Sequence, residues 1–177
     1  MAVRIRPERP ADADAVAAVV EAAFADPALA RLVAELRDEP SYRTSRALVA
    51  VDGERVVGYV LVTDSVLTSP DGDDVGRVAT LSPLAVAPDR QRQGIGAALV
   101  AAVLAACDAE GEPAVVLEGD PGYYGRLGFE AAAPHGLVHP LPDWAPPEAA
   151  QLHRLAAWTG ALRGTVTYSP PFDRLPH

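Results

Sequence analysis

A long helical pattern that begins at two closely spaced glycines constrains this chain more than any other feature. Residues 94–110 carry apolar side chains at helical spacing, among them Leu99 and Val103, and they follow an apolar strand pattern over residues 78–86. A helix start has unpaired N–H groups and a partial positive charge, and glycine lets an anion approach the backbone closely. Gly94 and Gly96 therefore predict a phosphate-binding turn or, alternatively, a tight strand-to-helix turn without a ligand.

Two common phosphate-binding motifs do not match this turn. A dinucleotide-binding fingerprint needs a third glycine where this chain has Leu99, and a Walker A loop needs a lysine, which the sequence lacks altogether. Gln91, Arg92 and Gln93 precede the glycines and supply further donors at the rim of the turn.

Strand and helix patterns alternate along the rest of the chain, which is typical of an α/β domain with a mixed sheet. The periodicity predicts strands over residues 3–6, 46–51, 55–63, 78–86, 114–117, 129–132 and 165–168, and helices over residues 12–24, 28–36, 94–110, 122–127 and 148–159. Pro83 cannot donate to a β-ladder, so we expect a bulge or an open edge near it.

The composition narrows the functional classes. A net charge of −9 argues against a basic nucleic-acid-binding face. The single cysteine, Cys107, excludes an intrachain disulfide, and we expect it to pack in the core. The four histidines (135, 139, 153 and 177) show no convincing metal-ligand spacing, so we expect no metal.

No apolar run reaches the about 20 residues that a membrane helix needs, and the N-terminus has no signal-peptide core, so we expect a cytoplasmic protein. The absence of lysine and asparagine is typical of a G+C-rich, bacterial genome.

Three motifs occur in a specific order. They are Ile5-Arg6-Pro7 with Ala11-Asp12-Ala13, Gln91-x-x-Gly94-x-Gly96-Ala97 after Leu84–Pro88, and Tyr123-Tyr124-Gly125-Arg126-Leu127-Gly128-Phe129. Each is common alone, but their combination resembles the GNAT family of N-acetyltransferases. The length and the lack of a dividing linker predict one domain over residues 1–177. The resemblance covers a core over about 3–132, and it extends to a bacterial subgroup of predicted acetyltransferases for the extension over about 133–177. It also implies a mixed, mostly antiparallel sheet that is splayed at strands 4 and 5 and flanked by helices.

The resemblance implies a site for acetyl-CoA. The backbone of Leu84, Ala85 and Val86 would pair with the pantetheine arm, and an N–H group there would polarise the thioester carbonyl. The segment that would hold the pyrophosphate comprises Gln91, Arg92, Gln93, Gly94, Ile95, Gly96 and Ala97. Many relatives have an asparagine after the fifth strand; here Asp120 either replaces that contact or caps the next short helix.

The same resemblance implies a catalytic role for one residue. Tyr124 stands where many relatives place the general acid that protonates the departing CoA thiolate. Glu118, from its position at the end of its strand, is either a candidate general base or a surface or structural carboxylate. Thr80 and Ser82 are an alternative that would order a water chain. Nothing in the sequence activates Cys107, so direct attack by the amine in a ternary complex is favoured over a covalent cysteine intermediate.

The amine acceptor is not identified by the sequence. The resemblance places it beside residues 24–45 and 134–158, which contain Glu35, Arg37, Glu39, His135, His139, Trp144 and His153. Transfer of another acyl group, transfer to oxygen, and a non-catalytic acyl-CoA sensor are the alternatives to N-acetyl transfer. Members of the family commonly form homodimers, so we also expect a homodimer.

Overall fold

The computed structural model describes residues 2–175, which contain nine strands and four α-helices. The strands are β1 (Arg4–Pro7), β2 (Ala47–Asp52), β3 (Arg55–Thr68), β4 (Asp74–Val86), β5 (Ala114–Glu118), β6 (Glu130–Ala131), β7 (Leu137–Val138), β8 (Ala150–Arg154) and β9 (Gly164–Thr167). The helices are α1 (Ala13–Phe24), α2 (Pro27–Arg37), α3 (Ile95–Ala109) and α4 (Pro121–Tyr124). Short 3₁₀ turns are η1 (Pro10–Asp12), η2 (Thr44–Arg46), η3 (Pro88–Arg90), η4 (Gly125–Leu127), η5 (Ala133–His135), η6 (Pro147–Ala149) and η7 (Pro170–Arg174).

The strands form a mixed sheet with the main order β1-β2-β3-β4-β5-β8-β6. β4 pairs with β5 in parallel, whereas β1–β2, β2–β3, β5–β8 and β6–β8 are antiparallel. The parallel ladder joins Ala79–Thr80 to Val115–Val116, while β4 continues to Val86 and β5 to Glu118. The predicted α/β fold with a mixed, mostly antiparallel sheet is confirmed.

The described residues divide into two compact units. The first contains residues 2–63, 81–106 and 170–175, and the second contains residues 64–80 and 107–169. Strands β3 and β4 contribute residues to both units. The expectation of one domain over residues 1–177 stays a prediction.

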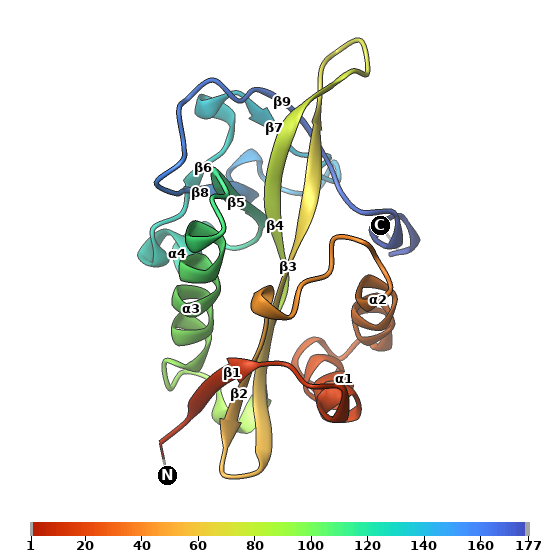
Figure 1. The fold of residues 1–177 in the computed structure, drawn as a ribbon, viewed down its shortest axis with the longest axis vertical. Coiled ribbons are helices and arrows are strands. Elements are labelled where there is room, and N and C mark those ends of the chain that lie inside the picture. The colour runs from red at the N-terminus through yellow and green to blue at the C-terminus, as the bar shows by residue number, and fades with distance from the viewer. Residues whose placement is uncertain (1, 176–177) are drawn as a thin grey trace. The chain divides into compact units, whose positions relative to one another are not determined.

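The first unit packs helices on both faces of its strands (Figure 1). Buried residues of α1 and α2 form one core cluster with β2 and β3: Val16, Val19, Val20, Leu32, Val33, Leu36, Val49, Tyr59 and Leu61. On the opposite face α3 lies so close to β3 that a Cβ at Gly58 would be 2.9 Å from Leu99 Cδ1. A side chain at Gly58 would therefore force the Leu99 side chain to shift.

Local signals set the helix boundaries of this unit. Ala25 takes a left-handed conformation (φ 52°) and ends α1, and the Asp26 carboxylate accepts from the Ala28 amide at 2.8 Å and caps α2. Pro27 occupies the first turn of α2, where a missing N–H costs nothing. The predicted helix over residues 94–110 is found as α3.

The second unit differs from the sequence prediction at residues 148–159. The sequence predicts a helix there, but residues 150–154 form strand β8. β8 pairs antiparallel with β5 over five residues, from Ala114↔Arg154 to Glu118↔Ala150. The helix prediction was wrong because backbone pairing with β5 and burial of Ala150 and Leu152 outweigh local propensity.

Candidate functional site

The end of β4 alternates between core and open positions. Ala85 is buried in the core cluster beneath α1 and α2, whereas Leu84 and Val86 are half-buried. The Ala87 amide, directly after β4, donates to Val57 O at 2.9 Å, which fixes the end of the strand against β3. Of the three predicted residues, Leu84 and Val86 thus have partly accessible side chains, and Ala85 offers only its backbone.

The turn that joins β4 to α3 has an unusual backbone. Arg92 (φ 60°) and Gly94 (φ 81°) both take positive φ, while Gln93 between them does not. Positive φ is uncommon for a residue with a side chain and is concentrated at functional sites. Alternating left- and right-handed residues form concave nests of N–H groups that bind anions. The free N–H groups of the first turn of α3, at Ile95, Gly96 and Ala97, follow directly.

Side-chain amides brace this turn from within. Gln91 Nε2 donates to Val86 O at 3.1 Å, and Gln93 Nε2 donates to Asp89 O at 3.4 Å. Gln93 Oε1 accepts from Arg90 Nε at 3.2 Å. The two glutamines were predicted to supply donors at the rim, but in this structure they stabilise the shape of the turn.

Two ion pairs tie η3 to the β2–β3 hairpin. Arg55 donates two hydrogen bonds to the Asp89 carboxylate, at 2.7 and 2.8 Å, and Arg90 pairs with Asp52. The exposed Arg55–Asp89 pair adds little to the free energy of unfolding, but its bidentate geometry restricts orientation. The pairs therefore hold the turn in one position relative to the hairpin.

A cavity of about 250 Å³ lies beside this turn. Its lining residues come from the first strand, the turn and the start of α3: Val3, Ile5, Arg90, Gln93, Gly94, Ile95 and Ala98. A Cβ at Gly94 would meet no atom within 4 Å, so the backbone is accessible at the mouth of α3.

In the second unit, β5 leads into the short helix α4. The Asp120 carboxylate accepts from the Gly122 amide at 2.8 Å, so Asp120 is an N-cap, which was one of the two roles considered for it. Gly128 ends the following η4 turn in a left-handed conformation (φ 89°), as the sequence predicts.

Tyr124 lies in an aromatic cluster at this corner. Its ring contacts Tyr123 and Phe129 edge-on, with centroid distances of 4.9 and 5.6 Å. A Cβ at Gly119 would be 2.6 Å from Tyr124 Cε2, so only glycine leaves room for the ring. Burial raises the pKa of Tyr124 to about 12, and the hydroxyl stays protonated at neutral pH. Tyr124 is therefore available as a proton donor. The neighbouring Tyr123 is exposed.

Glu118 ends β5, and its carboxylate accepts a hydrogen bond from the Tyr168 hydroxyl. Burial raises the pKa of Glu118, and the hydrogen bond from Tyr168 acts in the opposite direction. A raised pKa brings a carboxylate closer to the range in which it serves as a base at neutral pH. Tyr168 was not singled out in the sequence because it lies 50 residues from Glu118.

The alternative residues for a water chain differ in their surroundings. Thr80 is buried, and its hydroxyl lies 2.6 Å from Ser65 Oγ, so it is already engaged. Ser82 is half-buried in β4. Cys107 is buried in α3, in agreement with a core position.

The late histidines occupy three different environments. His153 Nδ1 lies 2.9 Å from Gly128 O, and its ring packs against Phe129, which indicates a structural role. His135 Nε2 lies 3.2 Å from Glu130 at the surface. His139 is buried and lies 3.1 Å from the Tyr168 hydroxyl. Trp144 is 80% exposed.

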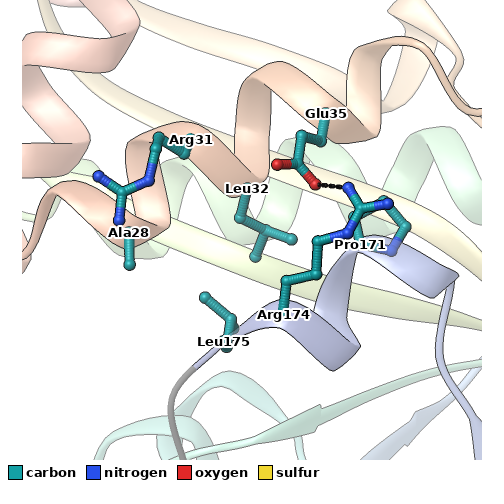
Figure 2. A pocket seen from close by; sticks show the side chains of 7 residues that line it. All are labelled: Ala28, Arg31, Leu32, Glu35, Pro171, Arg174 and Leu175. Atoms are coloured by element: carbon teal, nitrogen blue, oxygen red, sulfur yellow. Dashed lines mark hydrogen bonds and ion pairs between the residues drawn. The ribbon is translucent and has the colours of Figure 1, made fainter.

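Two of the early acceptor candidates, Arg37 and Glu35, are engaged in ion pairs. Arg37 pairs with the buried Glu8, and Glu35 pairs with Arg174 beside a cavity of about 60 Å³. Figure 2 shows this cavity between α2 and η7, with Leu32 and Leu175 on its two sides. Its volume is that of a few water molecules.

Comparison with known proteins decides the family. An acetyltransferase (GNAT) domain model matches residues 4–132, which include the β4–α3 turn, Glu118 and Tyr124. The chain belongs to the GNAT acetyltransferase family. The N-acetyltransferase assignment made from the sequence is confirmed at this level.

Several GNAT relatives are similar over almost the whole chain. The uncharacterized N-acetyltransferase YhbS of Escherichia coli K12 is 38% identical over 174 residues, which cover 96% of this chain and 98% of YhbS. A crystal structure of E. coli YhbS in complex with CoA superposes with a TM-score of 0.86 at 36% identity, covering 98% of this chain and 93% of that one. A GNAT acetyltransferase from Brucella melitensis in complex with acetyl-CoA gives a TM-score of 0.77 at 29% identity, covering 97% and 99%.

Two features are absent from residues 2–175. Within this range no group of three or more His, Cys, Asp or Glu side chains is arranged to hold a metal ion. No helix in the same range is long and apolar enough to cross a membrane. His177 lies outside the described residues.

Proposed function

We propose that this chain transfers the acetyl group of acetyl-CoA to the amine of a small molecule or peptide, by direct attack in a ternary complex. The observation that carries the proposal is the β4–α3 turn, where Arg92 and Gly94 take positive φ next to the free first-turn amides of α3. Such an array of N–H groups suits the pyrophosphate of a CoA thioester. The crystal structures of two relatives with CoA and acetyl-CoA support the same ligand.

The proposed reaction assigns one proton transfer to each predicted catalytic residue. Glu118 accepts a proton from the acceptor ammonium, and the neutral amine nitrogen attacks the thioester carbonyl carbon. The bond between that carbon and the CoA sulfur breaks, and the Tyr124 hydroxyl protonates the departing thiolate. The attacking nitrogen loses its second proton to solvent as the amide forms, and the Tyr124 phenolate regains its proton from solvent. The backbone N–H groups near Leu84 and Val86 would stabilise the oxyanion that forms during attack.

Acetyl-CoA is expected to stabilise the protein against heat. At a concentration of 100 times the Kd, binding adds about 2.7 kcal/mol, which corresponds to a rise in Tm of about 5–10 °C for a chain of this length. Arg92→Gly should reduce this rise because it removes a cation, while glycine accommodates the positive φ. Arg77→Ala, on the exposed start of β4, removes the same charge elsewhere and should leave the rise unchanged. Equal rises for both variants would contradict the assigned turn.

The Arg55–Asp89 ion pair beside the β4–α3 turn leads to a second prediction. Asp89→Asn removes the carboxylate that Arg55 grips, so the turn should become less ordered and acetyl-CoA should bind several-fold more weakly. The Tm of the free protein should hardly change, because the pair is solvent-exposed. Calorimetric titration with acetyl-CoA measures the Kd, and an unchanged Kd would show that the pair does not position the turn.

A thiol-release assay over a panel of amines tests turnover itself. Release of CoA that depends on one amine identifies the acceptor class. Binding of acetyl-CoA without release for any amine would favour a non-catalytic acyl-CoA sensor. Faster release from a longer acyl-CoA would assign a different acyl group.

A further inference from the structure

Three polar side chains that are far apart in sequence meet in the second unit. The Tyr168 hydroxyl donates to Glu118 Oε1, and His139 Nδ1 lies 3.1 Å from the same hydroxyl oxygen. The rings of His139 and Tyr168 also meet edge-on, with centroids 6.4 Å apart. His139 is only 7% exposed. The result is a continuous chain from a buried imidazole through a phenol to a carboxylate.

The number of hydrogens shared along the His139–Tyr168–Glu118 series of hydrogen bonds determines the tautomer of His139. A phenol carries a single hydrogen, and that of Tyr168 is donated to Glu118. The contact between His139 and Tyr168 must therefore use an Nδ1–H group that donates to the phenol oxygen. His139 Nε2 is then unprotonated; it is buried and has no hydrogen-bond partner among the described residues. Burial also lowers the pKa of His139 to about 4, which keeps the ring neutral.

We propose that His139 and Tyr168 are positioning residues that hold Glu118 Oε1, so that Oε2 receives the ammonium group of the acceptor. The inference rests on the proposed function and deepens it. In the step concerned, one N–H bond of the ammonium breaks, an O–H bond forms at Glu118, and the nitrogen lone pair becomes free for attack. The acceptor is thus an amine that arrives in its cationic form.

Of the groups around Glu118, Tyr168 is the one that affects the pKa of its carboxylate. On β8, Ala150 stands opposite Glu118, and Gln151 Nε2 donates to Gly119 O at 3.0 Å. On β4, Thr80 pairs with β5 at Val116, and its hydroxyl is engaged by Ser65. None of these groups titrates. Among the described residues, Tyr168 is the titratable group that contacts Glu118, and His139 faces Tyr168.

Tyr168→Phe tests the positioning role through a pH profile. The hydrogen bond from Tyr168 stabilises the ionised carboxylate and lowers the pKa of Glu118. Without it the pKa rises, so the acidic limb of kcat/KM should move to higher pH, and kcat/KM at pH 7 should fall about 10-fold. Glu118→Gln should lose more, about 100- to 10,000-fold, with the thermal shift by acetyl-CoA retained. Tyr123→Phe, a matched loss of an exposed hydroxyl, should leave the limb in place.

The tautomer gives a readout that does not need turnover. Nitrogen-15 NMR of the histidine rings, with the His139 signals assigned from His139→Leu and with His135→Leu as the surface control, should show Nδ1–H for His139 from pH 5 to 9. An Nε2–H tautomer, or an unmoved acidic limb in an otherwise active Tyr168→Phe enzyme, overturns the inference and leaves the proposed function standing. Failure of the wild-type chain to acetylate any amine overturns both.

Discussion

Tyr124→Phe is expected to lower kcat by about 100- to 10,000-fold, the range over which general acids act. The substitution removes one oxygen and keeps the ring, whose edge-on contacts with Tyr123 and Phe129 should survive. Because burial holds the pKa of Tyr124 near 12, the wild-type hydroxyl carries its proton at every pH at which the protein is normally assayed. The loss should therefore be the same from pH 6 to 9.

The control for this prediction is the neighbouring residue. Tyr123→Phe also removes a phenolic oxygen, but its side chain is 38% exposed. It should keep kcat within about twofold, and both variants should keep the Tm and the thermal shift by acetyl-CoA. Retention of full turnover by Tyr124→Phe would exclude Tyr124 as the acid. A leaving thiolate that needs no proton donor would then be the simpler mechanism.

The features that the sequence predicted depend on local chemistry. The β4–α3 turn, the Asp120 cap and the Gly128 helix end are all defined within a few residues, so their residue types reveal them. The same holds for α3, whose apolar spacing is regular over four turns. Residue-level roles at the site remain predictions, because spacing along the chain does not report bound ligands.

The features that the sequence missed depend on long-range pairing. Strand β8 has a helix-favouring composition and becomes a strand because β5 offers it a pairing edge. The Tyr168 contacts with Glu118 and His139 span 50 and 29 residues. Glu8 looks like a loop residue that follows a proline, yet it is 6% exposed, and its partners are 29 to 51 residues away. No local signal distinguishes such residues from solvated ones.

Glu8 is also the site of the largest expected change in stability. Its carboxylate accepts from Arg37 Nε at 2.9 Å, from the Tyr42 hydroxyl at 2.9 Å and from the Tyr59 hydroxyl at 3.2 Å. Burial and the Glu8 charge raise the pKa of both tyrosines, so the phenols remain donors. The network joins α2 to the start of the chain and to β3.

Glu8→Gln is therefore expected to destabilise the protein by about 3–5 kcal/mol, because it leaves the Arg37 guanidinium without its counter-charge in a largely buried site. This corresponds to a fall in Tm of about 6–20 °C. Glu35→Gln on α2, the helix that carries Arg37, removes a carboxylate from the exposed pair with Arg174. It should change the free energy of unfolding by about 1 kcal/mol at most. Urea denaturation of both variants measures the difference. If Glu8→Gln lost no more than Glu35→Gln, the network would not anchor α2, and hydrophobic packing of Leu32, Val33 and Leu36 would have to hold the helix in place alone.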